Sequence, residues 1–385
     1  MSASSGIRDK LALCACDSRG AQNRRGVSFE AAYRRVDPKK RNTHGEFPSQ
    51  LKPSVPDSVP TRERASGGVL LYLDLIVSAR PVPLVSIVTP SFNMAQYLPD
   101  TIESVLSQDY PRIEYIVVDG GSTDATAEIL RGYGDRLRLL TGKDKGPSDA
   151  AHRGFRDATG EILAWLNADD TYLPGAIRTA VEYLLDNPEV DVVYGQGNWM
   201  DEQGVVIRRY PTLPFDAKAL ERDCFICQPA SFIRASSYRR CGLDPDVNRS
   251  FDYDLWIRMA NLNFRFASIP QYLAHSRMHS GAKTLSERDD VFRASMRLLL
   301  RHYGYIPFQW VFGYTAYCLD QRDQFFQPLR PSLGKYVTSL PMGLSLNRTH
   351  RFRFLCEWLA APWVGLKRRL QETRRSSTNS PLRLR

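Results

Sequence analysis

Short apolar runs recur between residues 85 and 170 and alternate with amphipathic segments. The runs are VSIVTPSF (85–92), IEYIVVDGG (113–121), LRLLTG (137–142) and EILAWLNADD (161–170). They are compact, rich in aliphatic residues and bounded by Gly, Asn, Asp or Ser, which is typical of buried strands. The pattern therefore predicts four strands in this part of the chain.

The segments between these runs carry helical spacing. Residues 94–108 place apolar side chains on one face, and residues 126–133 follow a candidate N-cap at Ser122-Thr123-Asp124. A third helix is predicted over about 174–187, with proline in its first turn. Strands that alternate with helices in this way predict an α/β domain. Its mostly parallel central sheet should be covered by helices on both faces, as in Rossmann-like folds.

Beyond residue 190 the pattern becomes less regular. Residues 191–210 are predicted to form two strands around a tight turn, and residues 227–240 a loop and strand that run into a helix. SFDYDLWIRMANL (250–262) is predicted to be helical. The apolar side of this helix is expected to carry Leu255, Met259 and Leu262.

Local composition and hydrophobic pattern divide the chain into four parts. Residues 1–80 are polar, basic and rich in Ser and Pro, so a flexible extension is predicted. Residues 81–285 form the α/β domain, and residues 286–370 are predicted to be helical and aromatic-rich. A basic disordered tail is predicted for residues 371–385.

The helical C-terminal region raises the question of a membrane. No run reaches the roughly 18 apolar residues that a spanning helix needs. Trp358 and Trp363 lie next to Lys367-Arg368-Arg369, which suits a segment at a membrane surface and equally a helix packed on the domain. With no apolar leader apparent, we expect a cytoplasmic location, either free or at the cytoplasmic face of a membrane.

Charge and cysteine content indicate which binding partners and which cellular compartment to expect. The 385 residues carry a formal net charge of +10, which indicates acidic partners such as phosphates or anionic headgroups. The basic tails lack a nucleic-acid-binding module, so no nucleic acid is expected. Seven cysteines form no regular framework, and a reducing compartment fits best. Cys224 and Cys227 have no second pair at zinc spacing, so buried thiols are expected.

Polar residues gather where the predicted strands end. Ligands of parallel sheets bind at this edge. The chain has no GxGxxG and no GxxxxGK[ST], which argues against a dinucleotide-binding fold or a P-loop kinase. The strand-end residues are Thr89, Ser91, Asn93, Asp119, Asn167, Asp169 and Asp170.

Asp169 and Asp170 follow the apolar run ILAWL directly. Because a buried charge is costly unless something compensates it, a partner is expected. Two carboxylates with the Asn167 amide nearby suit Mg²⁺ or Mn²⁺, which commonly combine one or two carboxylates with substrate phosphates. A solvated turn in which an aspartate caps the next helix remains the alternative.

Two further segments contain candidate catalytic or ligand-binding residues. Asp252 and Asp254 lie at a partly apolar helix start, where a carboxylate can act as general base, or can favour the helix dipole or pair with Arg258. His279 lies in a loop of small polar residues. It could bind a metal or a phosphate, although a lone loop histidine is often incidental.

Together these segments resemble a family 2 glycosyltransferase of the GT-A fold, over roughly residues 84–282. The matching stretches include VSIVTPSFNMAQYLPDTIESVLSQDYPRIEYIVVDGGSTDAT, DKGPSDAAHRGFRDATGEILAWLNADDTYLPGA, QPASFIR and FDYDLWIRMA, in the correct order. The resemblance implies transfer of a sugar from a nucleotide-diphosphate donor to a saccharide or lipid-linked acceptor, with inversion. It also implies a role in polysaccharide or glycolipid biosynthesis.

The resemblance assigns roles position by position. Asn167-Ala168-Asp169 matches the family's D-x-D motif, which implies that Asp169 binds Mg²⁺ or Mn²⁺, with Asp170 and His279 as further candidate ligands. Asp252 takes the place of the catalytic base. The implied donor-binding residues are Thr89, Pro90, Ser91, Asn93, Asp119, Lys145, Asn167 and Asp169, and the implied acceptor-side residues are Gln228, Pro229 and Asp254.

Three positions depart from the commonest pattern of the family. Gly120 stands where many relatives carry a second aspartate, Asn167 opens the D-x-D motif without a charge, and Phe251 replaces the first acid of the E/D-D pair. The combination resembles a branch with DGGSTD and LNxDD. A nucleotidyltransferase on a similar sheet, or a sugar-nucleotide-binding protein without activity, remains the alternative.

Overall fold

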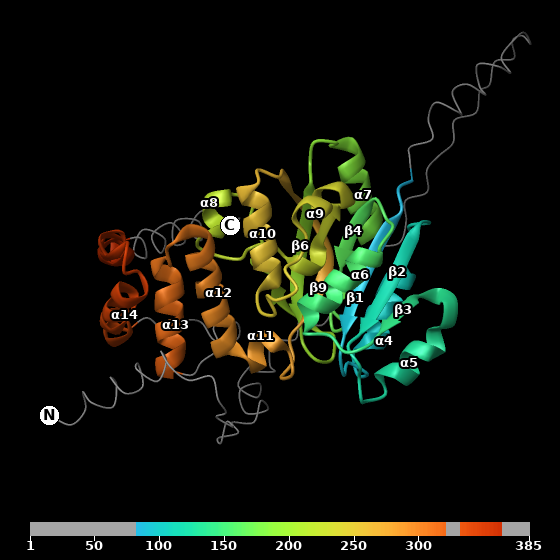
Figure 1. Ribbon diagram of the computed structural model, residues 1–385, viewed down its shortest axis with the longest axis horizontal. Coiled ribbons are helices and arrows are strands. Elements are labelled where there is room, and N and C mark those ends of the chain that lie inside the picture. Colours follow the sequence, from blue (N-terminus) through green and yellow to red (C-terminus); the bar gives the residue numbers. More distant parts are fainter. Residues whose placement is uncertain (1–81, 321–331, 364–385) are drawn as a thin grey trace, which may run out of the picture. The chain divides into compact units, whose positions relative to one another are not determined.

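The computed structural model describes residues 82–320 and 332–363. The predicted extension 1–80 and the predicted tail 371–385 lie outside the described residues. The central sheet has nine strands, and Figure 1 shows those of its parallel region side by side. Their order is β3 (Arg138–Thr141), β2 (Ile113–Asp119), β1 (Val85–Ser91), β4 (Ile162–Trp165), β8 (Ser231–Arg234), β6 (Val192–Met200), β9 (Phe266–Arg277) and β5 (Thr171–Tyr172), with β7 (Val206–Arg209) paired to β6.

Helices connect and flank these strands. The three helices predicted in the first part are confirmed as α4, α5 and α7. The N-cap residue of α5 is Ala125 and not one of Ser122-Thr123-Asp124, although Asp124 accepts a hydrogen bond from the Thr126 backbone N–H at 3.0 Å. The helices are α4 (Leu98–Leu106), α5 (Thr126–Tyr133), α6 (Pro147–Asp157), α7 (Ala176–Asp186), α8 (Ala217–Leu220), α9 (Ala235–Cys241), α10 (Phe251–Asn261), α11 (Lys283–Ser286), α12 (Arg288–Tyr303), α13 (Phe308–Asp320) and α14 (Leu333–Leu346), with short 3₁₀ turns at Gly134–Arg136 and Gln228–Ala230.

The first four strands of the chain form the predicted parallel region. β1 pairs in parallel with β2 and β4, and β2 with β3. The register places Ser91 opposite Asp119 and Asp119 opposite Thr141, so these strands end together at one edge of the sheet. The loops that follow them therefore lie next to one another.

Both faces of this parallel region are covered, as predicted. On one face Ile87 packs in a hydrophobic cluster with Ile102 of α4, and residues of α5 and α7 join the same cluster. On the other face Trp165 stacks on Trp256 of α10, with ring centroids 5.7 Å apart, and meets Phe155 of α6 edge-on at 5.9 Å. The α/β class expected from the sequence is confirmed.

The second half of the sheet is mixed. β8 pairs antiparallel with β4 and β6, β7 pairs antiparallel with β6, and β9 runs parallel to β6. The two strands predicted over residues 191–210 are thus β6 and β7. The long strand β9 pairs with the edge strand β5, which brings the end of β9 beside the turn that follows β4.

Helix α10 confirms the helix predicted over residues 250–262, with one correction. Leu255 and Met259 are fully buried, as expected, but Leu262 is 50% exposed. The helix ends at Asn261, so Leu262 is its C-cap residue and no longer follows the helical spacing. The apolar side of α10 is therefore one turn shorter than predicted.

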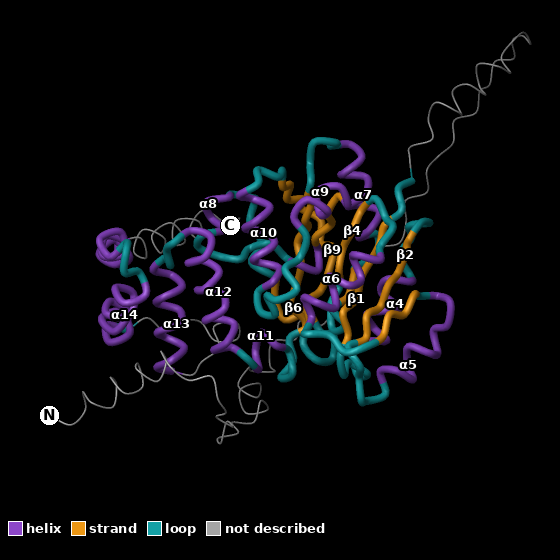
Figure 2. The backbone as a smooth tube through the Cα atoms, viewed as in Figure 1, coloured by secondary structure: helices purple, strands orange, loops and turns teal. Residues whose placement is uncertain are grey.

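The chain after β9 is helical in the parts that the structure describes. Helices α12, α13 and α14 lie next to one another in Figure 1, and Figure 2 shows them apart from the strands. A further helix covers residues 351–363. Among the described residues, no helix is both long enough and apolar enough to cross a bilayer.

Candidate active site

A cavity of about 1070 Å³ opens beside the carboxyl ends of the parallel strands. It is slightly larger than the usual ligand pocket, about 300 to 1,000 Å³. Residues at the ends of β1 and β2 and in the turn after β4 line one side, and residues of α10 to α13 line another. The edge predicted from the sequence is thus the edge where the cavity lies.

The loops after β1 and β2 are bound to each other. The Asp119 carboxylate accepts hydrogen bonds from the backbone N–H groups of Gly121 at 3.2 Å and Ser122 at 3.1 Å. Asn93 has a left-handed backbone, with φ of 54°, and its side-chain oxygen accepts from the Thr123 backbone N–H at 2.8 Å. Asp119 and Asn93 therefore hold the shape of these loops.

The predicted donor residues of these loops fall into two groups. Pro90, Ser91 and the neighbouring Gly120 line the cavity. Thr89 is fully buried, with its hydroxyl 3.1 Å from the Tyr115 hydroxyl, and is not part of the lining. An added Cβ at Gly120 would lie 2.5 Å from Asp144 Oδ2, so a larger residue here would require the Asp144 side chain to shift. The glycine that departs from the family pattern thus lies against the Asp144 carboxylate.

The turn after β4 carries the two adjacent aspartates, and they have different surroundings. Asp169 lines the cavity, and its Oδ2 lies 3.0 Å from His279 Nε2, although the two residues are 110 positions apart. The Tyr97 ring packs against the His279 ring, with centroids 4.5 Å apart. The structure thus brings together two residues that the sequence analysis proposed as metal ligands.

Asp170 is 3% exposed and is held by hydrogen bonds from two sides. Its Oδ1 accepts from the Arg277 backbone N–H at 2.9 Å and its Oδ2 from Asn167 Nδ2 at 3.2 Å. Burial, with a smaller contribution from the negative Asp169, raises the pKa of Asp170 well above its ordinary value.

Asn167 explains how this buried carboxylate is accommodated. Its Nδ2 donates to Asp170 and also to Gln228 Oε1 at 3.0 Å, and Gln228 Nε2 donates to the Trp165 backbone carbonyl at 2.8 Å. An aspartate at position 167 would have no hydrogen to donate when ionised and would repel Asp170. The amide that departs from the D-x-D pattern therefore has a defined partner.

Arg277, at the end of β9, was not anticipated from the sequence. Its guanidinium donates to the Asp169 backbone carbonyl at 2.9 Å, to Asp100 at 2.9 Å and to the Glu202 backbone carbonyl at 3.0 Å. It is 4% exposed. Arg277 therefore fixes the turn that presents Asp169 to the cavity.

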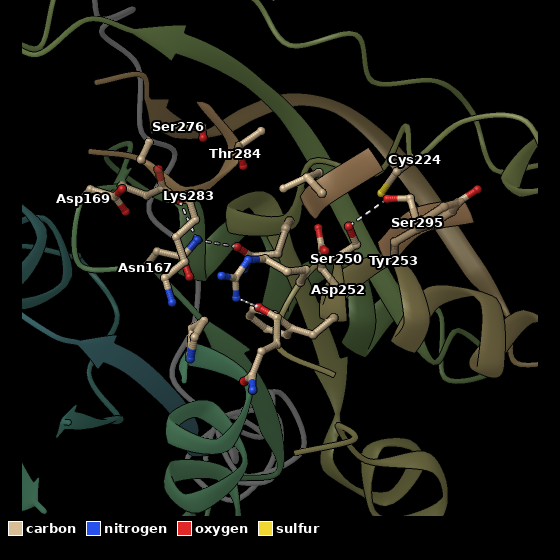
Figure 3. A pocket seen from close by; sticks show the side chains of 18 of the residues that line it. Asn167, Asp169, Cys224, Ser250, Asp252, Tyr253, Ser276, Lys283, Thr284 and Ser295 are labelled. Carbon is tan, nitrogen blue, oxygen red and sulfur yellow. Dashed lines mark hydrogen bonds between the residues drawn. The ribbon is translucent and has the colours of Figure 1, made fainter. Parts of the chain in front are cut away.

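Asp252 lines the cavity from α10, in the first turn of the helix. Figure 3 shows Asp252 on one side of the cavity and Asn167 and Asp169 on the other. Ser250, the N-cap residue of α10, has a left-handed backbone with φ of 54°, and its hydroxyl lies 2.8 Å from the Ser295 hydroxyl of α12. Burial raises the pKa of the Asp252 carboxyl above its ordinary value of 3.8.

Asp254 does not line the cavity. Its carboxylate is fully buried, 2.7 Å from Arg258 Nε and 2.7 Å from His302 Nε2 of α12. Burial acts to raise the pKa of Asp254, but the hydrogen bond from His302 and the charge of Arg258 outweigh it and the pKa is lowered. This predicted acceptor-side residue joins α10 to α12, whereas Gln228 does line the cavity and Pro229 is buried in the turn beside it.

Cationic side chains also line the cavity. Lys145, predicted from the sequence, is exposed and pairs with Asp246 at 3.0 Å. Lys283 and Arg249, which the sequence analysis did not single out, lie in the lining too, and Figure 3 shows Lys283 near Asn167 and Asp169. Burial and the nearby Arg249 lower the pKa of Lys283. Lysine and arginine side chains are the groups that bind phosphates through charge-assisted hydrogen bonds.

A divalent cation needs several oxygen or nitrogen ligands. No group of three or more His, Cys, Asp or Glu side chains gathers anywhere in residues 82–320 or 332–363. Asp169 supplies a carboxylate at the cavity wall, and His279, which is 4% exposed and not part of the lining, lies behind it at 3.0 Å. This set fits an ion such as Mn²⁺ or Mg²⁺ that completes its shell with substrate phosphates and water. Cys227 is a buried free thiol, as expected, whereas Cys224 is a half-buried free thiol that lines the cavity.

Two sequence comparisons concern the same part of the chain. The profile of the family described as glycosyl transferase family 2 matches residues 86–241. An uncharacterized glycosyltransferase of Rickettsia prowazekii (strain Madrid E) is similar, with 30% identity over 243 aligned residues that cover 57% of this chain and 73% of that protein. The chain spans only about a third of several other matched glycosyltransferases.

Two more distant similarities accompany these. The chondroitin synthase of Escherichia coli has 24% identity over 302 aligned residues, which cover 74% of this chain and 42% of the synthase. A mannosyltransferase from Pyrobaculum calidifontis, solved in complex with GDP-Man and Mn²⁺, has 19% identity and a TM-score of 0.46, covering 77% of this chain and 94% of that one. The structural similarity is too low to assign a ligand or a metal to this chain.

Proposed function

Because the chain belongs to glycosyltransferase family 2, we propose that it transfers a sugar from a nucleoside-diphosphate donor to an acceptor hydroxyl and inverts the anomeric configuration. The observation that carries the proposal is that Asp169 and Asp252 line opposite sides of one cavity. One side suits the departing diphosphate and the other suits the proton of the incoming hydroxyl. A single displacement with inversion needs this arrangement and only one base.

Asp252 is the proposed base. Its carboxylate accepts the proton of the acceptor hydroxyl while the acceptor oxygen bonds to the anomeric carbon and the bond from that carbon to the donor phosphate breaks. The nucleoside diphosphate then leaves with the electron pair of the broken bond. Asp252 suits this role because its pKa is raised by burial, which makes the carboxylate a stronger base.

The leaving-group side rests on Asp169, His279 and Lys283. Asp169 and His279 would hold Mg²⁺ or Mn²⁺, which when bound stabilises negative charge on a leaving diphosphate. Lys283 adds a positive charge at the same side of the cavity. Asp170 and Arg277 hold the turn in shape, and we assign them this positioning role.

The nucleotide is proposed to bind at the ends of β1 and β2. Pro90, Ser91 and Gly120 line the cavity there, and Asp119 and Asn93 fix the loops around them. The acceptor is proposed to bind near Gln228 and Asp252. A saccharide or lipid-linked acceptor, and thus a role in polysaccharide or glycolipid biosynthesis, is supported by the similarity to a chondroitin synthase.

Release of nucleotide from a panel of sugar nucleotides tests this function. The wild-type protein is expected to release nucleoside diphosphate from one donor in the presence of Mn²⁺ or Mg²⁺, and to lose this activity with a chelator. Asp169→Ala is expected to lose it as well, because one of the two side chains at the metal site is removed. The control is Asp135→Asn, an exposed aspartate outside the cavity.

Three results would contradict the proposal. Release of pyrophosphate from a nucleoside triphosphate would identify a nucleotidyltransferase. Thermal stabilisation by a sugar nucleotide without any turnover would identify a protein that binds the donor but does not use it. Full activity of Asp169→Ala would contradict the assignment of the leaving-group side.

A further inference from the structure

The helix over residues 351–363 is apolar on two opposite sides. Its inner side is docked on the preceding helices: Phe354 is fully buried, with its ring 6.3 Å from the Phe308 ring of α13, and Trp358 stacks on Tyr336 of α14 with centroids 4.2 Å apart. An added Cβ at Gly343 would lie 1.9 Å from the Phe354 ring, so α14 approaches this ring closely. The helix is therefore held firmly by one side.

Its outer side carries a row of exposed apolar residues, which we call the outer stripe: Phe352, Cys356, Leu359 and Trp363. Phe352 is 79%, Leu359 56% and Trp363 73% exposed, and Cys356 is exposed as well. Residues spaced by four, three and four positions lie on one side of an α-helix. Phe352, Trp363 and Leu333 of α14 are the three most exposed large hydrophobic residues in the described chain. Such a concentration marks an interaction site.

Charge indicates what binds there. Glu357 is the only carboxylate between residues 351 and 363, and it faces inward, where it accepts from the Phe308 backbone N–H at 3.1 Å and pairs with Arg353 at 3.7 Å. Arg348 and Arg351 are exposed at the start of the helix. The sequence after residue 363 contains seven Lys or Arg residues and one Glu. The apolar row is thus flanked by positive charge.

We propose that the outer stripe binds the surface of an anionic lipid bilayer, with the helix lying in the plane of the interface. Exposed Trp, Phe and Leu on one side together with flanking Lys and Arg are the features of interfacial helices. A second copy of the chain is a poorer occupant, because it would place the same positive flanks against each other. This inference does not depend on the proposed transferase activity.

Co-sedimentation of the full-length protein with phosphatidylcholine vesicles that contain phosphatidylglycerol tests the proposal. The protein is expected to pellet with these vesicles, and less with phosphatidylcholine alone or at high salt. The triple variant Phe352→Ser, Leu359→Ser, Trp363→Ser should bind at least about tenfold more weakly, because three apolar side chains no longer enter the interface.

A matched triple variant controls for loss of surface hydrophobicity in general. Val205, Leu213 and Leu262 are 62%, 48% and 50% exposed and lie outside the helix over 351–363. Val205→Ser, Leu213→Ser, Leu262→Ser should pellet like the wild type, and nucleotide release without vesicles should be unchanged in the stripe variant.

Two outcomes overturn the proposal and identify another occupant. Sedimentation velocity without vesicles that shows a dimer in the wild type and a monomer in the stripe variant, with no vesicle binding, would make the stripe an interface between copies. A clear fall in the melting temperature of the stripe variant, again with no vesicle binding, would mean that another segment of the chain covers the stripe.

Discussion

The side-chain amide of Asn167 allows the carboxylate of Asp170 to be buried, because it donates a hydrogen bond to that carboxylate. Asp170 is 3% exposed, and the hydrogen bonds from Asn167 and from the Arg277 backbone replace the water it has lost. Asp169, next to it, lines the same cavity, and its carboxylate lies 3.0 Å from His279. Asp170, the less certain metal ligand of the sequence analysis, is thus proposed to hold the position of Asp169.

Asn167→Asp tests this account of the buried carboxylate. The variant replaces a donor by a second carboxylate 3.2 Å from Asp170. It should lower the free energy of unfolding by about 1 to 3 kcal/mol, the cost of leaving a buried polar group unsatisfied, measured by denaturant unfolding at pH 7. Asn263→Asp, at an exposed position, is the control and should change stability little. Equal stability of Asn167→Asp and wild type would contradict the role of the amide as a donor.

The pH dependence of transfer tests Asp252. Only the carboxylate form accepts a proton, so kcat/KM should fall as the pH falls through the pKa of Asp252. Because burial raises that pKa, the acid limb of the profile should lie above 3.8. An acid limb at or below 3.8 would show that this carboxyl is not the base.

At the scale of elements, α6 illustrates why some of the fold escaped the sequence analysis. Its segment PSDAAHRGFRD is mostly polar, and the residues it buries are mainly small, with Ala150, Ala151 and Gly154 among them. Apolar periodicity detects helices that bury large side chains, so this helix gave no strong signal. The helix can lie close to β1 and β2 because its side chains are small.

At Gly154 the backbone of α6 lies so close to β1 that a side chain would collide with it. An added Cβ would lie 2.4 Å from Val88 Cγ1 of β1. Gly154→Ala should therefore lower the free energy of unfolding by about 1 to 3 kcal/mol through overpacking, measured by thermal or denaturant unfolding. Gly132→Ala in α5 is the matched control, because nothing lies within 4 Å of its Cβ position, and alanine should stabilise that helix by up to about 1 kcal/mol. Stabilisation by both alanines would contradict the packing described for α6.

The site residues that lie in short sequence motifs could be predicted, whereas those defined by contacts with distant segments could not. Asp169, Asp252 and His279 were foreseen because short motifs around them match a known family. Arg277, Lys283 and Arg249 were not, because their roles depend on contacts with segments far away in the chain: Arg277 reaches Asp100 and the Asp169 carbonyl. No local pattern marks an arginine at the end of a strand as buried.

For the molecule as a whole, the cavity depends on both halves of the chain. The parallel region supplies the strand ends and the turn with Asp169, and the later helices supply Asp252, Lys283 and Ser295. The contact of Asp254 with His302 and that of Ser250 with Ser295 join α10 to α12. The α10 to α12 contacts thus place the proposed base opposite the proposed leaving-group side, so the region after residue 283 contributes to the site as well as to the outer stripe.

The central claim is that Asp252 removes the acceptor proton in a cavity that binds the donor independently of it. Sugar transfer and donor binding by Asp252→Asn, beside the control Asp135→Asn, test this claim most directly. We expect Asp252→Asn to bind the donor with a Kd close to that of the wild type and to lose about 10²- to 10⁴-fold in kcat, the usual contribution of a general base. Transfer by Asp252→Asn at the wild-type rate, with donor binding intact, would contradict the account.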